Sequence, residues 1–257
     1  ETGKQLPYIG EFYFKKARSG TQRDLDLIAG TCDQTHLETP GLFTFINEQA
    51  RNADAPFRII EGRWTLVFHL ELNLSLYQGV KTDRDREMRK LFRNLEFRKA
   101  VSYAIDRAGL AKSLVPGPML RPLPGCFPSG ADYYDPKAVV SYSYNQKAAK
   151  DILAKLGFKD TDKDGILNWT SGPLKGQNLT IVAKVHEDQT ACVDLSDALV
   201  PMFQKVGIRL VPKIYKATVG QAMDTAGEFE MNITRGDFLA SPYTSLSSLG
   251  PVTPSSP

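Results

Sequence analysis

Three aspartates at alternate positions form a metal-binding pattern in the chain. Asp160, Asp162 and Asp164 precede Gly165 and Ile166, which matches the opening of a calcium loop: spaced carboxylates, a turn glycine and then an apolar residue. The glutamate that closes such a loop would fall at position 171, which is a serine. The same residues suit a surface turn in which aspartates accept hydrogen bonds from nearby amides and the glycine adopts a positive φ. We favour the turn, predict no bound metal or cofactor, and keep a calcium-dependent interaction module as an alternative.

The cysteines and histidines form no recognised catalytic pattern. Cys32, Cys126 and Cys192 match no zinc or redox spacing. We interpret them as buried unpaired thiols, with one disulfide left open as an alternative. The three histidines are far apart, and the chain lacks a nucleophile elbow, a phosphate loop, a dinucleotide fingerprint and the paired-histidine zinc motif.

Prolines and glycines are concentrated between Val115 and Pro136. This density excludes a regular helix or strand and predicts a long ordered loop, which is a common place for function. The loop could act as a lid over carboxylates such as Asp132 and Asp135, so a lid-covered enzyme is a second alternative. Because nucleophile and base signatures are missing, we predict a binding protein rather than an enzyme.

Apolar spacing predicts the helices that would position these residues. Between Phe92 and Arg107, Asn94 can cap a helix whose apolar residues recur at intervals of three and four; they are Phe97, Ala100, Val101, Ala104 and Ile105. A second helix follows Asn145, and a third extends from about Gln189 to Val206. The charged stretch 81–90 is interpreted as a solvated loop or helix face.

Alternating apolar residues predict strands at 11–16, 64–72, 178–185, 208–211 and 229–234. Strand and helix alternate in the second half of the chain, which favours a mixed or parallel sheet flanked by helices. The expected fold class is α/β.

Composition narrows the possible partners. The chain has 257 residues, is 42% hydrophobic and carries a net charge of +3, so it can bury a core but does not suggest nucleic acid as a partner. No apolar run approaches the ~18 residues of a membrane span. No basic and apolar leader opens the chain, and we expect any export signal to be absent from this sequence.

The segment Phe97–Arg107, FRKAVSYAIDR, resembles the V-R-x-A-L-x-x-A-I-D-R helix of the family 5 extracellular solute-binding proteins of ABC importers, which bind peptides, dipeptides or nickel. Lys205–Ile208 resembles the K-x-G-I junction of this family, and Glu228–Met231 resembles its G-x-F-D-M strand. The resemblance covers nearly the whole chain.

The resemblance implies periplasmic-binding-protein-like lobes, each with a mixed sheet flanked by helices, that close on a solute. Residues 1–68 would belong to the first lobe and the hinge approach, 69–235 to the second lobe, and 236–257 to the return crossover and a ragged end. Family members are much longer, so we expect a fragment. The implied protein is a periplasmic or cell-surface monomer that captures an oligopeptide or another small polar solute and delivers it to a membrane permease.

In peptide-binding members, a G-W-x-x-D segment follows the F-D-M strand, and its aspartate takes the α-ammonium group of the ligand. Here that aspartate position falls at Leu239, and Asp237 stands two residues earlier. The pattern is therefore broken, which puts a peptide ligand in doubt while leaving solute binding in place.

The predicted ligand-binding residues are Arg235, Asp237, Phe238 and Tyr243, which follow the strand ending at Thr234. In open α/β sheets, ligands bind outside the carboxyl ends of strands. An arginine and an aspartate with two aromatic side chains suit a small polar ligand. The alternative is that Arg235 and Asp237 pair with each other and only stiffen the hinge.

Overall fold

The computed structural model describes residues 7–37, 39–60, 67–114, 120–123 and 134–236. The chain divides into two compact units, Glu1–Ile59 and Ile60–Pro257. The predicted boundaries at 68/69 and 235/236 concern lobes of a longer protein and stay predictions.

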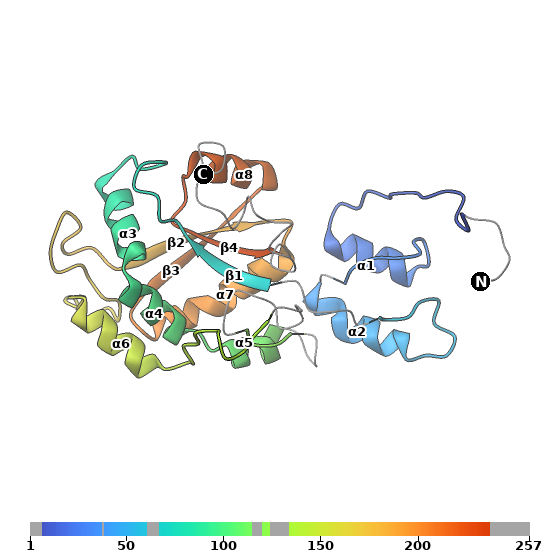
Figure 1. Cartoon of the computed structure of the whole chain (residues 1–257), viewed down its shortest axis with the longest axis horizontal. Helices are drawn as coiled ribbons and strands as arrows, with labels where there is room; N and C mark the ends of the chain where they lie inside the picture. Colours follow the sequence, from blue (N-terminus) through green and yellow to red (C-terminus); the bar gives the residue numbers. More distant parts are fainter. Residues whose placement is uncertain (1–6, 38, 61–66, 115–119, 124–133, 237–257) are drawn as a thin grey trace. The chain divides into compact units, whose positions relative to one another are not determined.

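The first unit contains two helices, α1 (Gly20–Ile28) and α2 (Pro40–Ala50) (Figure 1). The hydroxyl of Ser19 caps α1 by accepting a hydrogen bond from the backbone amide of Gln22. Asp24 is buried, and its carboxylate accepts a hydrogen bond from the amide of Thr39, which precedes α2. A buried acidic group therefore joins the two helices.

The strand predicted at 11–16 is wrong. These residues adopt no regular structure, and the side chains of Phe12 and Phe14 are 74% and 96% exposed. Alternation stabilises a strand only when a neighbouring strand accepts its hydrogen bonds and a core covers its apolar face. Among the described residues, this segment has neither.

The second unit is built on one mixed sheet. Its described strands are β1 (Val67–Leu72), β2 (Thr180–His186), β3 (Arg209–Tyr215) and β4 (Met231–Gly236), in the order β1-β4-β2-β3. Strand β2 is parallel to both β3 and β4, whereas β1 and β4 are antiparallel. The predicted α/β class and mixed sheet flanked by helices are confirmed.

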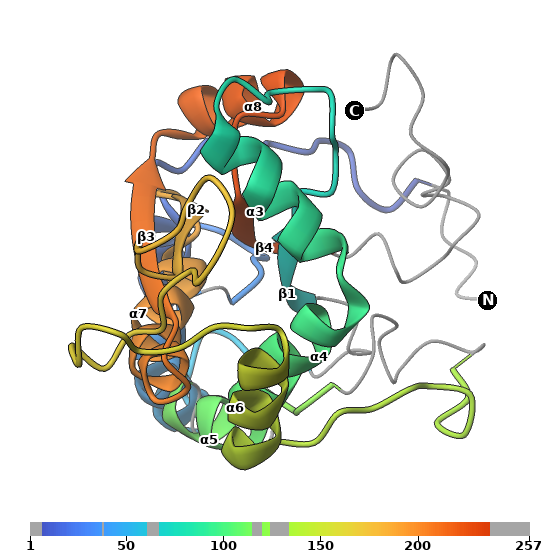
Figure 2. The ribbon, with the colours of Figure 1, turned by 90° about the vertical axis from the view of Figure 1, so that its left-hand side faces the viewer.

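In the described part of this unit, six helices accompany the sheet (Figure 1): α3 (Asp83–Arg93), α4 (Leu95–Ala104), α5 (Arg107–Leu114), α6 (Gln146–Lys155), α7 (Thr190–Gln204) and α8 (Ala217–Ala226). Asn94 and Asn145 cap α4 and α6 as predicted. The extended backbone of Asn94 also ends α3, so this residue separates α3 from α4 (Figure 2). None of the described helices is long and apolar enough to cross a membrane.

The apolar stripe predicted on α4 is buried in the main core. Helix α4 packs against α3, α6 and α7, and its stripe belongs to the same core cluster as Ile181, Ala183 and Val185 on the inward face of β2. Each of these three strand residues is fully buried. The core therefore lies on one face of the sheet.

The charged stretch 81–90 is more than a solvated face. Thr82 and Asp85 form a capping box that starts α3. Arg84 forms a two-pronged ion pair with Glu230, at 2.9 and 3.2 Å, and also donates to the carbonyl of Thr180. Because Glu230 also accepts the amide of Val182 at 2.8 Å, this part of α3 ties the start of β4 to β2.

We expect Ala104→Asp to destabilise the second unit by several kcal/mol. The methyl group of Ala104 is fully buried in the core, and an unpaired carboxylate there would be left without hydrogen bonds. Thermal denaturation measures the effect. Leu95→Asp is the matched control, because it adds the same charge to the exposed first turn of the same helix. Equal melting temperatures for the two variants would contradict this placement of α4.

Candidate functional site

The carboxyl ends of β2 and β4 lie at the same edge of the sheet. The strands are parallel, with Val185 opposite Ile233, so the segment after His186 meets the end of β4. Helix α7 begins there, immediately after Gln189. Ligands of open α/β sheets bind outside this edge, which makes it the candidate binding site.

Of the four predicted ligand-binding residues, Arg235 lies within the described part of the chain. It is half-buried near the end of β4, opposite Phe68 of β1 in the strand register. Its positive charge acts on the thiol of Cys192 in the first turn of α7. Asp237, Phe238 and Tyr243 lie outside the described residues, so their roles stay predictions.

Gln189 connects α7 to β4 at this edge. Its side-chain oxygen accepts hydrogen bonds from the thiol of Cys192 at 3.2 Å and from the hydroxyl of Thr234 at 3.4 Å. Burial raises the pKa of the Cys192 thiol to about 12, so this thiol is protonated near neutral pH and acts as a donor. Sequence analysis missed Gln189 because no motif marks a lone glutamine between a strand and a helix.

The interpretation of the cysteines as buried unpaired thiols is confirmed for Cys192 and only in part for Cys32. Cys192 is buried and unpaired, and Cys32 is half-buried and unpaired. Cys126 lies outside the described residues. A thiolate is the reactive form of cysteine, so the raised pKa of Cys192 makes it a poor nucleophile.

A charged cluster lies on the face of the sheet opposite the main core. Lys184 of β2 is 2% exposed, and its ammonium group donates to the carboxylate of Asp224 and the carbonyl of Gly220, both on α8. It also lies 3.2 Å from Nε2 of His186 and 5.4 Å from the ring centre of Phe229. The alternation at 178–185 identified the apolar face of β2 but left this buried polar face unrecognised.

A polar row continues across the same face toward β1. Asn232 of β4 is 5% exposed and donates to Glu71 at 2.8 Å, and His69 lies 2.9 Å from the other oxygen of Glu71. Burial alone would raise the pKa of the Glu71 carboxyl, but hydrogen bonds from His69 and Asn232 outweigh it and lower the pKa below its usual value. The row therefore keeps the carboxylate of Glu71 ionised on β1, at the edge of the described sheet.

A shallow hollow of about 290 Å³ lies beside this cluster, and its lining extends from Val182 and Glu230 to Tyr215 at the end of β3. The charged groups that line it all have partners: Lys81 pairs with Glu228, Lys184 with Asp224 and Glu230 with Arg84, and Asp85 accepts the amides of Lys81 and Thr82. These contacts already use the charges, so the hollow is a weaker binding candidate than the carboxyl edge.

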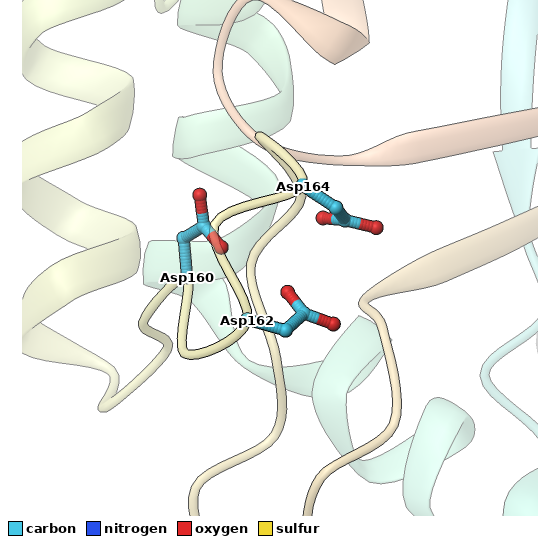
Figure 3. A group of neighbouring side chains, drawn as sticks. All are labelled: Asp160, Asp162 and Asp164. Atoms are coloured by element: carbon cyan, nitrogen blue, oxygen red, sulfur yellow. The ribbon is translucent and has the colours of Figure 1, made fainter.

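The aspartate turn gathers its three carboxylates around one small loop (Figure 3). Asp160 accepts hydrogen bonds from the amides of Lys163 and Gly165, at 2.7 and 3.0 Å. Asp164 accepts the amide of Ile166 at 2.7 Å, which lowers the pKa of its carboxyl. Gly165 has φ +86°. These contacts support the turn interpretation, because loop amides use the carboxylates of Asp160 and Asp164.

The loop behind the enzyme hypothesis lies mostly outside the described residues, and so does Asp132. Asp135 is exposed, and its carboxylate accepts a hydrogen bond from the amide of Lys137 at 2.8 Å. That contact belongs to a local turn and brings Asp135 near no other carboxylate that the structure describes.

The family profile described as "Bacterial extracellular solute-binding proteins, family 5 Middle" matches residues 2–256. The periplasmic alpha-galactoside-binding protein of Rhizobium meliloti (strain 1021) is 35% identical over 236 residues, which cover 91% of this chain. The oligopeptide-binding protein AppA of Bacillus subtilis (strain 168) is 27% identical over 134 residues, or 50% of this chain and 23% of AppA.

Solved structures show the same fold. The periplasmic binding protein MelB of Agrobacterium fabrum C58, in complex with stachyose, superposes with a TM-score of 0.89 at 33% identity over 94% of this chain. AppA of Bacillus subtilis in complex with a nonapeptide gives a TM-score of 0.56 at 20% identity over 87% of this chain and 40% of AppA. The chain spans 34% of the length of the Rhizobium relative and 36% of that of MelB.

We expect Asp224→Ala to lower the free energy of unfolding by about 2–3 kcal/mol, because it leaves the buried ammonium of Lys184 without a carboxylate. Adding Lys184→Met should recover most of this loss by removing the buried charge. Asp151→Ala is the matched control, since the exposed Lys147–Asp151 pair should contribute less than about 0.5 kcal/mol. Urea denaturation compares Asp224→Ala, the double variant and Asp151→Ala with the unsubstituted protein. A double variant less stable than Asp224→Ala would contradict this explanation.

We expect calcium to raise the melting temperature by no more than about 1 °C, because turn amides use the carboxylates of Asp160 and Asp164 and the closing glutamate is missing. Thermal shift with calcium and with a chelator measures this. A shift of many degrees at micromolar calcium that disappears in Asp162→Asn would overturn the turn interpretation.

Proposed function

Because the chain belongs to the family 5 bacterial extracellular solute-binding proteins, we propose that it forms part of the solute-binding component of an ABC importer. The family match agrees with the resemblance carried by Phe97–Arg107. In this proposal the protein acts outside the cytoplasm, in the periplasm or at the cell surface, as a monomer. It captures a solute between two lobes and delivers it to a membrane permease, without catalysis.

The solute in this proposal is an oligosaccharide of the α-galactoside class. The observation that carries it is the 35% identity to an alpha-galactoside-binding protein over 91% of the chain. Sequence identity to the oligopeptide-binding protein AppA is lower, at 27%, and the match covers only 50% of the chain. The broken aspartate pattern at Leu239 also argues against the peptide that the sequence first suggested.

The chemistry of the carboxyl edge is compatible with a neutral polyol. Arg235 offers several N–H donors and no acceptor, and the amide of Gln189 offers two more donors. Hydroxyl and glycosidic oxygens accept such hydrogen bonds. Phe238 and Tyr243 lie outside the described residues and stay in the proposal as predicted aromatic contacts to the solute, a residue type that is usual in small-molecule pockets.

Isothermal titration calorimetry tests this proposal on the longer protein, whose length is expected from its relatives. Stachyose and a nonapeptide are titrated separately. Saturable binding of stachyose with no heat from the peptide supports the proposal. Binding of the peptide alone would replace the oligosaccharide by a peptide, and turnover of either compound would favour the enzyme alternative.

We expect Arg235→Ala to weaken stachyose binding by about tenfold or more, because it removes hydrogen bonds that a charged donor makes to the solute. The melting temperature should change little. Arg209→Ala, at the amino end of β3, is the matched control and should leave the affinity unchanged. A lowered melting temperature with unchanged affinity would instead identify Arg235 as part of a structural pair.

A further inference from the structure

The side chain of Gln189 is oriented by what its oxygen accepts. The oxygen and nitrogen of an amide have nearly the same shape, so hydrogen-bond partners decide which way the group faces. Here the thiol of Cys192 and the hydroxyl of Thr234 both approach the same atom, Oε1. Because sulfur is only a weak acceptor, an amide N–H facing Cys192 would gain little. The protonated thiol of Cys192 instead donates to the side-chain oxygen of Gln189. Two donors on one atom therefore fix Oε1 toward α7 and β4.

This orientation leaves the amide nitrogen facing away from both contacts. Nε2 makes no hydrogen bond to any residue in the described part of the chain, although Gln189 is half-buried. Its two N–H groups lie at the carboxyl edge, and Arg235 directly follows Thr234 in β4. The positive charge of Arg235 also reaches this edge, because it acts on the thiol of Cys192.

The capping role that is usual at this position does not account for this side chain. Gln189 stands at the N-cap position of α7, where a side chain commonly accepts hydrogen bonds from the first amides of the helix. It makes no such capping bond; the thiol and the hydroxyl use its oxygen instead. Helix α7 therefore starts without a cap from the side chain of Gln189, and the two side-chain N–H groups remain able to donate to a solute.

We propose that Gln189 is a solute-binding residue whose two amide N–H groups donate to acceptor oxygens of the solute, and that Cys192 and Thr234 are positioning residues that hold the amide in this orientation. The inference rests on the proposed function, because it places the solute at the carboxyl edge. The solute groups it selects are hydroxyl, glycosidic or carboxylate oxygens. A sugar and a peptide both contain such acceptors, and the two arms of the test distinguish them.

The first experiment uses Gln189→Glu in the longer protein, titrated with stachyose and, separately, with a nonapeptide. Glutamate keeps the shape of glutamine but replaces both N–H donors by a charged acceptor. We expect the affinity for the bound compound to fall by about tenfold or more, with little change in melting temperature. Gln221→Glu is the matched control, because it makes the same change on the exposed face of α8 and should leave the affinity unchanged.

The second experiment tests the positioning residues. Cys192→Ala removes the thiol donor and should weaken binding by about threefold, whereas Cys192→Ser keeps a donor at the same place and should restore most of the affinity. Thr234→Val removes the hydroxyl at nearly constant shape and should also weaken binding by about threefold. Equal affinities for Cys192→Ala and Cys192→Ser would overturn the orienting role of the thiol.

A third measurement needs no solute. The S–H stretching band of Cys192 in the Raman spectrum reports the hydrogen bond of the thiol, and Gln189→Leu should shift it toward the position of a free thiol. An unshifted band would overturn the contact itself. Binding of either compound with unchanged affinity in Gln189→Glu would overturn the binding role alone, and a wild-type protein that binds neither compound would overturn the proposed function together with this inference.

Discussion

Strand β2 is buried on both of its faces, and the arrangement of the second unit depends on this constraint. One face buries Ile181, Ala183 and Val185 in the main core. The other buries the ammonium group of Lys184, which cannot leave water without a partner. Helix α8 supplies that partner through Asp224. The central strand therefore requires an apolar layer on one side and a charged layer on the other.

The path of the chain explains how both layers form. From β2 the chain passes through α7 to β3, on one side of β2, and then through α8 to β4, on the other side. Parallel connections are almost always right-handed, so two crossovers that move in opposite directions along a sheet cover opposite faces. Helix α7 accordingly packs in the apolar core, while α8 covers the charged face. The same parallel order brings the ends of β2 and β4 together at the candidate site.

Local signals in the sequence predicted the elements that depend on neighbouring residues. Asparagine caps at 94 and 145, the apolar stripe of α4 and the positive φ of Gly165 were predicted correctly, because each is determined within a few residues. Contacts between distant residues were not predictable. Lys184 and Asp224 are 40 residues apart, and Arg84 and Glu230 are 146 apart, so nothing in the local pattern shows that these charges are buried or paired.

The same limit applies to the candidate site: residues marked by a local feature were predictable, and residues placed by distant contacts were not. The rule that ligands lie beyond strand ends identified Arg235, because the end of a strand is a local feature. The placement of the Gln189 side chain depends on a contact with Thr234, 45 residues away. Its proposed role could therefore not be inferred before the fold was known.

The position of Arg235 in the register places the proposed site where the chain enters and leaves the described sheet. The sheet begins at Val67 and ends at Gly236, and these residues are opposite one another in the antiparallel pair of β1 and β4. Arg235 and Phe68 form the next pair of that ladder. A solute that binds Arg235 would therefore contact the strands at the point where the chain enters and leaves the sheet. In the proposed two-lobe mechanism, a solute held at this point shifts the equilibrium between open and closed states only as far as it binds the closed state more tightly.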